Sequence, residues 1–314
     1  MSSILTNTAA MTALKSLQIT NKSIETTQAR ISTGKQVAEA SDNAAYWSIA
    51  TTMRSDSSAL STVQDALGLG AAKVDVAYTG INSALEVVDE IKSKLVAASE
   101  PGVDRSKIQS EISELQNQLT SISESATFSG ENWLSVDSSV AGYSATKSVV
   151  ASFNRAADGS VSLATIDIDT TTTVLFDAGT GATEVGLLDK EYTAANGAAT
   201  PVNVTYSVAT LDITATNVDD TVLADMISNV DATVEALTTS ASDLGTSKKR
   251  INLQSTFVGD LMDAIERGIG KLVDADMTEE STRLQALQVQ QQLGVQSLSI
   301  ANGNAQTILS LFQG

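Results

Sequence analysis

Cysteine and histidine are both absent from this chain of 314 residues. Their absence excludes disulfides, thiolate nucleophiles and histidine-based catalytic triads, and it removes the two commonest protein ligands of zinc. Proline occurs only twice, and aromatic residues make up 4% of the chain. Because Leu, Ile, Val and Ala must then build the apolar core, the composition favours long helices over a compact fold centred on aromatic side chains.

Basic residues are few beside acidic ones: 19 Lys and Arg stand against 37 Asp and Glu, which gives a formal net charge of -18. This charge opposes binding to nucleic acid or to anionic membranes. No apolar run approaches the roughly 18 residues of a membrane span. The N-terminal MSSILTNTAAMTAL lacks the basic region and continuous apolar stretch of a secretory signal peptide. We therefore expect neither nucleic-acid binding nor membrane insertion, and these features alone favour a cytosolic protein.

Two long segments repeat apolar residues at alternating spacings of three and four. The first runs from Ile49 to Leu95 and the second from Leu223 to Leu272. Seams of nearly equal length are best buried by packing lengthwise against each other, and such a helix is roughly 70 Å long at about 1.5 Å per residue. A shorter run from Ile108 to Ala126 follows the Pro101–Gly102 turn and should fold back as a helical hairpin. The pattern predicts a mainly α fold, a long antiparallel coiled-coil or helical-bundle rod.

The segment 136–217, between the two seams, has a different composition, rich in Thr, Ala, Gly and Asp. Period-two alternation in ATIDIDT (164–170) and VNVTYSV (202–208) indicates strands. We expect a small inserted β-rich domain whose two ends return to the rod. The expected parts are an N-terminal assembly helix and turn (1–44), N-terminal rod helices (45–135), a variable β-rich insert (136–217), a C-terminal rod helix (218–275) and a C-terminal assembly helix (276–314).

No residue pattern indicates catalysis, a cofactor site or a metal site. The GLG at Gly68–Gly70 lies inside a continuous helical repeat with no preceding strand, so we interpret it as a pair of helix glycines and not as a phosphate loop. Asp167 and Asp169 alternate along a strand and lack calcium-loop spacing. Asp276 and Glu279 have the spacing of a helix capping box and should begin the last helix. We therefore expect neither an enzyme nor a cofactor.

The two ends of the chain carry a weaker apolar repeat with many polar or small residues. From Leu284 to Gly314 no side chain in 31 residues is charged. Burying a Leu-sized side chain contributes about 1.5–3 kcal/mol, so each end gains ~10 kcal/mol, comparable with the ~4–15 kcal/mol cost of association. We expect the end helices to be stabilised by other copies, through Leu14, Leu17, Ile24, Ile31, Leu284, Leu287, Leu298, Ile308, Leu311 and Phe312.

Both ends resemble the bacterial flagellin family. SILTNTAAMTAL near the start and ISTGKQVAEASDNAAYWSIA (31–50) are similar to the flagellin N-terminal signature. DADMTEE (274–280) and LQVQQQLGVQSLSIANGNAQTILSLF (287–312) are similar to its C-terminal signature. The resemblance covers roughly residues 1–135 and 220–314, and two motifs in the right order at opposite ends make it specific.

The resemblance implies a structural subunit that self-assembles into the helical flagellar filament used for motility. It also implies export by the flagellar type III apparatus without a cleaved signal peptide, and an extracellular location. The implied partners are other flagellin copies, a flagellin export chaperone, the filament cap and the hook-associated proteins. The nearest alternative is a hook–filament junction protein, which has similar ends. A coiled-coil adhesin or sensor would not need uncharged ends, and an enzyme is the least favoured class.

One stretch departs from many flagellins. By alignment, residues 86–91 occupy the segment that those flagellins offer to the innate immune receptor Toll-like receptor five, where they carry arginines. Val87 and Asp89 stand in place of arginine here, beside Glu90 and Ile91. Because the change removes multidentate donors and reverses the local charge, the resemblance predicts weak recognition by this receptor.

Overall fold

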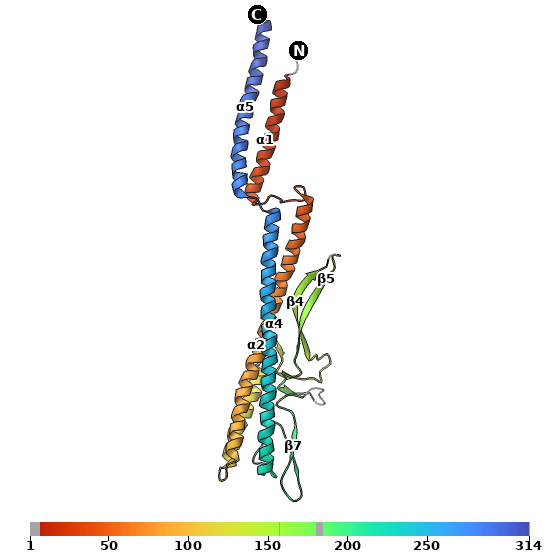
Figure 1. Cartoon of the computed structure of the whole chain (residues 1–314), viewed down its shortest axis with the longest axis vertical. Helices are drawn as coiled ribbons and strands as arrows, with labels where there is room; N and C mark the ends of the chain where they lie inside the picture. The colour runs from red at the N-terminus through yellow and green to blue at the C-terminus, as the bar shows by residue number, and fades with distance from the viewer. Residues whose placement is uncertain (1–6, 157, 180–184, 314) are drawn as a thin grey trace. The chain divides into compact units, whose positions relative to one another are not determined.

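A computed structural model describes the backbone of residues 7–156, 158–179 and 185–313, and the side chains as far as residue 303. Five helices dominate it (Figure 1). They are α1 (Thr8–Thr33), α2 (Ala44–Ala98), α3 (Arg105–Ser125), α4 (Asp220–Val273) and α5 (Met277–Gln313). The strands are β1 (Thr127–Phe128), β2 (Glu131–Asn132), β3 (Ser135–Val136), β4 (Thr146–Arg155), β5 (Val161–Asp169), β6 (Phe176–Asp177), β7 (Tyr192–Ala195) and β8 (Asn203–Tyr206). The mainly α fold with an inserted β-containing region is as the sequence predicts.

Aspartates begin three of the helices. Asp104, Asp219 and Asp276 precede α3, α4 and α5, and each carboxylate accepts a hydrogen bond from the backbone N–H two residues ahead. Such caps satisfy amides that have no partner within the helix and place negative charge at the positive end of the helix dipole. The Asp276 cap therefore acts as the sequence analysis expects, although Glu279 bonds Arg283 and does not complete a capping box.

The chain forms two compact units, residues 1–58 with 262–314 and residues 59–261. No helix in the part of the chain that the structure describes is long and apolar enough to cross a membrane.

In the second unit, α2 and α4 pack antiparallel. Lys92 is bonded to Asp231, and 17 residues earlier on α2 Asp75 is paired with Lys248, which lies 17 residues later on α4. Equal and opposite steps along two helices are the signature of antiparallel pairing in constant register. After the turn at residues 101–102, α3 folds back on α2 and Lys94 pairs with Glu111 at 2.6 Å.

The predicted seam of α2 forms the core of this unit. From Leu60 onward, every predicted seam position is buried: Leu60, Val63, Leu67, Gly70, Val74, Ala77, Ile81, Ala84, Val88, Ile91 and Leu95. Ile108, Ile112 and Leu119 of α3 are also buried, as are Leu223, Val230, Leu237, Leu244, Ile251 and Val258 of α4. The helical repeat therefore gives the packed face of α2. On α4 it is wrong at alternate positions, because Met226, Thr233 and Ser240 are buried where the repeat predicts Ile227, Val234 and Ala241, which are half-exposed.

Within the described residues, the strands form four separate two-stranded ribbons and not one sheet. β4 and β5 make the longest, an antiparallel hairpin with an irregularity between Val150 and Ser152. β7 pairs with β8, β1 with β2, and β3 runs parallel to β6. Because an isolated two-stranded ribbon is only marginally stable in water, these ribbons depend on the helices that they contact.

Side chains from the helices hold the ribbons and loops in place. Gln116 of α3 donates to the Val208 and Leu211 carbonyls at 3.1 Å, and Gln254 of α4 donates to the Ala151 carbonyl at 3.0 Å. Glu131 bridges Lys73 of α2 and Lys147 of β4 at 2.6 and 3.1 Å. Partial burial opposes ionisation of Glu131, but hydrogen bonds from the two ammonium groups outweigh it and lower its pKa. The segment 136–217 therefore belongs to the same compact unit as the helices.

Gly70 sets the distance between α2 and the β4–β5 hairpin. A Cβ atom built at Gly70 would overlap the two methyl groups of Val149 in β4, whereas one at Gly68 would meet nothing within 4 Å. The interpretation of these residues as helix glycines holds, and only Gly70 is needed for close approach.

We predict that Gly70→Ala destabilises the second unit whereas Gly68→Ala does not. The added methyl forces the hairpin away from α2, at a cost of about 1–3 kcal/mol for overpacking. At Gly68 the same change stabilises by up to about 1 kcal/mol through higher helix propensity. Denaturant unfolding followed by circular dichroism measures both, and equal shifts in midpoint for the two variants would contradict the packing argument.

Candidate functional site

Helices α1 and α5 bring the two ends of the chain together as an antiparallel pair (Figure 1). The Asn7 amide donates to the Ala301 carbonyl at 3.0 Å, and Gln291 donates to Asn21 at 2.8 Å. Asn7 also caps α1 by accepting from the Ala10 amide. The pair is thus fixed by polar contacts from one end of α1 towards the other.

The seam of α5 follows the predicted register, but its residues are only half-buried. Leu284, Leu287, Gln291, Gly294, Leu298 and Ala301 all have intermediate exposure. On α1 the buried residues are Ile24 and Thr27, and Leu17 and Ile31 are half-buried. A Cβ at Gly294 would lie 3.0 Å from a methyl of Leu17, so the small residue permits close approach of the helices.

Leu14 does not lie in the seam where the heptad pattern places it. Its side chain is 46% exposed, and Ala13 faces the partner helix more closely. The less exposed positions on α1 are Ala10, Ala13, Leu17, Thr20, Asn21, Ser23, Ile24, Thr27, Arg30 and Ile31, whereas Gln28 is exposed. The heptad assignment of α1 is ambiguous, because apolar residues spaced first by four and then by three positions fit a short helix as well as residues spaced first by three and then by four. The role of Leu14 in self-assembly remains a prediction. The side chains of Ile308, Leu311 and Phe312 lie beyond those the structure describes.

A buried carboxylate joins the two helices near their connected ends. The Glu280 side chain is 6% exposed, and its Oε1 accepts from Arg30 of α1 at 3.1 Å and from Arg283 of α5 at 3.3 Å. Arg283 also bonds Glu279 at 2.9 Å, on the exposed side. Sequence analysis missed this cluster because it stopped the α5 seam at Leu284, although Glu280 is the next position in the same register.

Two short connections are hydrogen-bonded to each other beside this cluster. The Val37 and Gln36 amides donate to the Val273 carbonyl, and the Ala275 amide donates to the Gly34 carbonyl. Gly34 ends α1 with φ 69, a left-handed conformation that glycine adopts without strain. Val37 and Val273 are buried. The two turns therefore form one structure that joins the ends of α1 and α5.

Acidic side chains shape these turns. Asp42 accepts from the backbone amides of Glu39 and Ala38, and these bonds lower its pKa. The amides of Glu279 and Thr278 lower the pKa of Asp276 in the same way. Because a lowered pKa in the fold means that the ionised form is favoured, both turns lose stability only as the pH falls through these carboxyl pKa values.

Large apolar side chains are exposed over the rest of this unit. They are Met11 (62%), Leu14 (46%), Ile19 (60%), Tyr46 (46%), Trp47 (37%), Ile49 (49%), Met277 (47%), Val289 (54%), Leu293 (57%), Val295 (54%) and Ile300 (61%). Exposed apolar side chains at this density mark an interaction surface. The seam prediction for Ile49 is wrong in this unit, where that side chain faces solvent.

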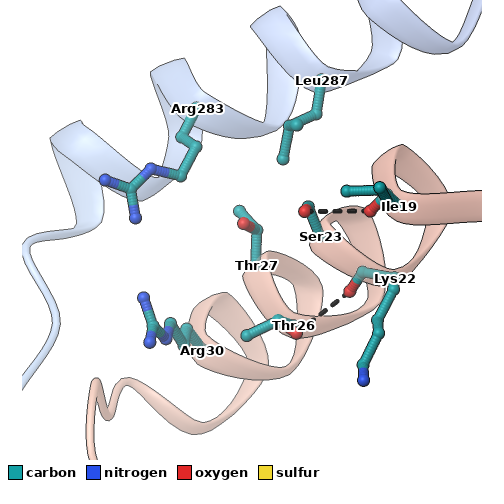
Figure 2. A pocket seen from close by; sticks show the side chains of 8 residues that line it. All are labelled: Ile19, Lys22, Ser23, Thr26, Thr27, Arg30, Arg283 and Leu287. Carbon is teal, nitrogen blue, oxygen red and sulfur yellow. Dashed lines mark hydrogen bonds between the residues drawn. The ribbon is translucent and has the colours of Figure 1, made fainter. Parts of the chain in front are cut away.

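A groove of about 560 Å³ opens between α1 and α5 (Figure 2). Its lining mixes cationic, hydroxyl and apolar side chains: Ile19, Lys22, Ser23, Thr26, Thr27, Arg30, Arg283 and Leu287. Figure 2 shows Arg30 and Arg283 extending to the same end of the groove from opposite helices, with Lys22 reaching away from α5.

Nothing in the described residues makes a catalytic arrangement. Burial raises the pKa of Asp189, where an amide of Asp177 opposes the shift and the Asp177 charge adds to it. No group of three metal-binding side chains is found in the part of the chain that the structure describes. Asp167 accepts from Ser148 and Asp169 from Thr171, on an exposed strand face.

Comparison with known proteins decides the family. The family model for the bacterial flagellin N-terminal helical region matches residues 4–139, and that for the bacterial flagellin C-terminal helical region matches residues 227–312. The chain is similar to "Flagellin C" of Rhizobium meliloti (strain 1021), 54% identical with both chains covered completely. This chain is a bacterial flagellin. Two further relatives are "Flagellin A" of the same strain, 45% identical, and "Flagellin" of Brucella melitensis biotype 1, 44% identical, both with complete coverage.

The family makes this flagellin a structural subunit of the bacterial flagellar filament and not an enzyme. The matched regions contain α1, α2 and α3 at one end and nearly all of α4 and α5 at the other. Residues 140–226, which neither family model matches, contain the β4–β5 and β7–β8 hairpins. None of these findings favours the hook–filament junction protein considered as the alternative.

We predict that Glu280→Gln loosens the α1–α5 pair. The change leaves Arg30 and Arg283 without their shared carboxylate, at a cost of about 1–3 kcal/mol for a charged hydrogen-bond partner. Hydrogen exchange should show faster amide exchange in α1, with the core of the second unit unchanged. Glu279→Gln is the matched control, because Glu279 is 67% exposed and exposed pairs contribute only about 0.2–1 kcal/mol. Equal exchange in the two variants would rule out a special role for the buried carboxylate.

Proposed function

We propose that α1 and α5 are the self-assembly surface through which copies of this flagellin join in the helical filament. The observation that carries the proposal is the half-burial of the α1–α5 seam together with the exposed apolar side chains around it. A helix pair that buries only Ile24 and Thr27 of α1 completely gains little from folding alone. Neighbouring copies provide the missing contacts.

The geometry of such an assembly is heterologous. Different faces of the same pair contact different neighbours, so the contacts do not close and the chain of copies continues as a helix. In this proposal residues 1–44 and 276–314 are the assembly segments, and 45–135 and 218–275 are the supporting helices. The β-containing residues 136–217 are then the part that is free to vary.

The remaining partners follow from the same surface. We propose that the uncharged C-terminal segment binds an export chaperone before assembly, and that the filament cap and hook-associated proteins contact the ends of the assembled copies. Export through the flagellar type III apparatus, without a cleaved signal peptide, would deliver the chain to the cell exterior. The complete lack of cysteine is compatible with passage as an unfolded chain.

Removal of residues 281–314 should abolish filament formation and leave a folded helical protein. The truncation takes away nearly all of α5 but leaves the buried seams of α2, α3 and α4 intact. Electron microscopy and sedimentation measure assembly, and circular dichroism measures the retained helix. Filaments formed by the truncated chain as readily as by the full chain would contradict the proposed role of α5.

Weak recognition by Toll-like receptor five is also a proposal. The exposure of residues 87–91 indicates which side chains a receptor could contact. Val87 and Ile91 are 7% and 0% exposed and belong to the α2 core. Asp89 and Glu90 are exposed on the same helix. A receptor approaching this face of α2 therefore meets two carboxylates and neither apolar side chain.

We predict that the unmodified chain gives a weak response in a cell reporter for Toll-like receptor five. Asp89→Arg should raise the response, because it restores a multidentate donor at an exposed position. Val87→Arg is unsuitable as a test, since it would bury a charge. The control is Glu86→Arg, which adds the same charge at an exposed neighbouring position. A response of the unmodified chain equal to that of an arginine-bearing flagellin would contradict the prediction.

A further inference from the structure

The groove between α1 and α5 carries more positive charge than its own chain neutralises. Lys22, Arg30 and Arg283 line it, and Glu280 is the carboxylate that both arginines share. The Arg30 Nε is buried and has no hydrogen-bond partner among the described residues. Nor does any described side chain pair with the Lys22 ammonium. Because Glu279 also pairs with Arg283, one positive charge, that of Lys22, is left without a carboxylate in a chain whose net charge is -18.

Two of the three hydroxyl groups in the groove already donate within α1. Ser23 donates to the Ile19 carbonyl at 3.0 Å and Thr26 donates to the Lys22 carbonyl at 3.0 Å, one helical turn back in each case (Figure 2). The remaining donors are the Lys22 ammonium, the Arg30 Nε and the Thr27 hydroxyl. Because two of the three are cationic, the chemistry that they select is an anion. Ile19, which is 60% exposed, and Leu287 add apolar surface beside them.

We propose that this groove binds a carboxylate side chain of a second copy of the chain. The proposal rests on the self-assembly proposed above and names one contact within it. Each copy brings one groove and 37 acidic side chains, so a filament supplies grooves and carboxylates in fixed proportion. The groove is also continuous with the exposed apolar surface of α1 and α5, so that a neighbour seated there covers both.

The charged residues of α1 and α5 limit which acidic residues can supply the carboxylate that enters the groove. Residues 8–33 carry Lys15, Lys22 and Arg30 against a single acid, Glu25, which is exposed and has no partner among the described residues. The acids of α5, Glu279 and Glu280, are already bonded to arginine. A carboxylate that enters the groove must therefore come from outside this pair of helices or from the Glu25 side of another α1.

Carbodiimide cross-linking tests the contact directly, because it joins an amine to a carboxylate only where the two touch. Filaments grown from equal amounts of ordinary and nitrogen-15-labelled chain are cross-linked, digested and examined by mass spectrometry. We expect peptides in which Lys22 is joined to an acidic residue of the other isotope, which identifies both the second copy and the residue. Cross-links of Lys22 only within one isotope would overturn the proposal.

A matched pair of variants tests the contribution to assembly. Lys22→Gln should raise the critical concentration for filament growth about two- to fivefold, as expected for a partly exposed ion pair. Lys15→Gln, on the same helix but outside the groove, should leave it nearly unchanged. Equal effects of the two substitutions would overturn the proposal.

Other occupants give different results. If inorganic phosphate, added at constant ionic strength, restores the assembly of Lys22→Gln or protects Lys22 in the unmodified filament, the groove binds a free anion and the proposal is wrong. A failure of the unmodified chain to form filaments would contradict self-assembly itself, whereas normal filaments without the Lys22 cross-link contradict the groove alone.

Discussion

The incomplete burial of the α1–α5 pair is the constraint on which the proposed self-assembly surface of this flagellin depends. If the seam were fully apolar, the two helices would bury it against each other, and a monomer would have no reason to bind neighbours. If it were highly charged, identical charges would meet wherever copies pack together. Half-buried Leu alternating with Gln, Gly and Ala avoids both outcomes. The helices remain paired through a few polar bonds, and their outward faces stay available.

The distribution of charge supports the same division between the two units. The unit formed by residues 1–58 and 262–314 has eight basic and ten acidic residues, a net charge of −2, whereas residues 59–261 have 11 against 27, a net charge of −16. Repulsion between the acidic units acts over about 10 Å at 0.1 M salt. Contacts that hold copies together are therefore best placed in the nearly neutral unit, and fixed cations such as Lys22 are most effective there.

Much of the helical architecture was readable from the sequence, because a buried face repeats with the helical period. Every position that the register predicts from Leu60 to Leu95 of α2 is buried, although the register does not include the buried Val87. Leu14 was misplaced because a short, weakly apolar helix does not distinguish between two heptad registers. The strands at 164–170 and 202–208 were predicted, but the alternation of apolar and polar residues does not indicate which strands pair. The four separate ribbons could therefore not be predicted. Nor does the helical repeat reveal that an added side chain would clash at Gly70 but not at Gly68, because Val149, which approaches Gly70, is distant in sequence.

The one charged residue on the α5 seam explains why the rest of that seam has none. Glu280 is tolerated because Arg30 and Arg283 of the same chain neutralise it, close to the turns that hold α1 and α5 together. From Leu284 onward no such arginine accompanies the seam. A carboxylate placed there would need a cation from a neighbouring copy, or it would be buried unpaired in every subunit at once. The uncharged tail is therefore the expected sequence for a helix whose partners are copies of itself.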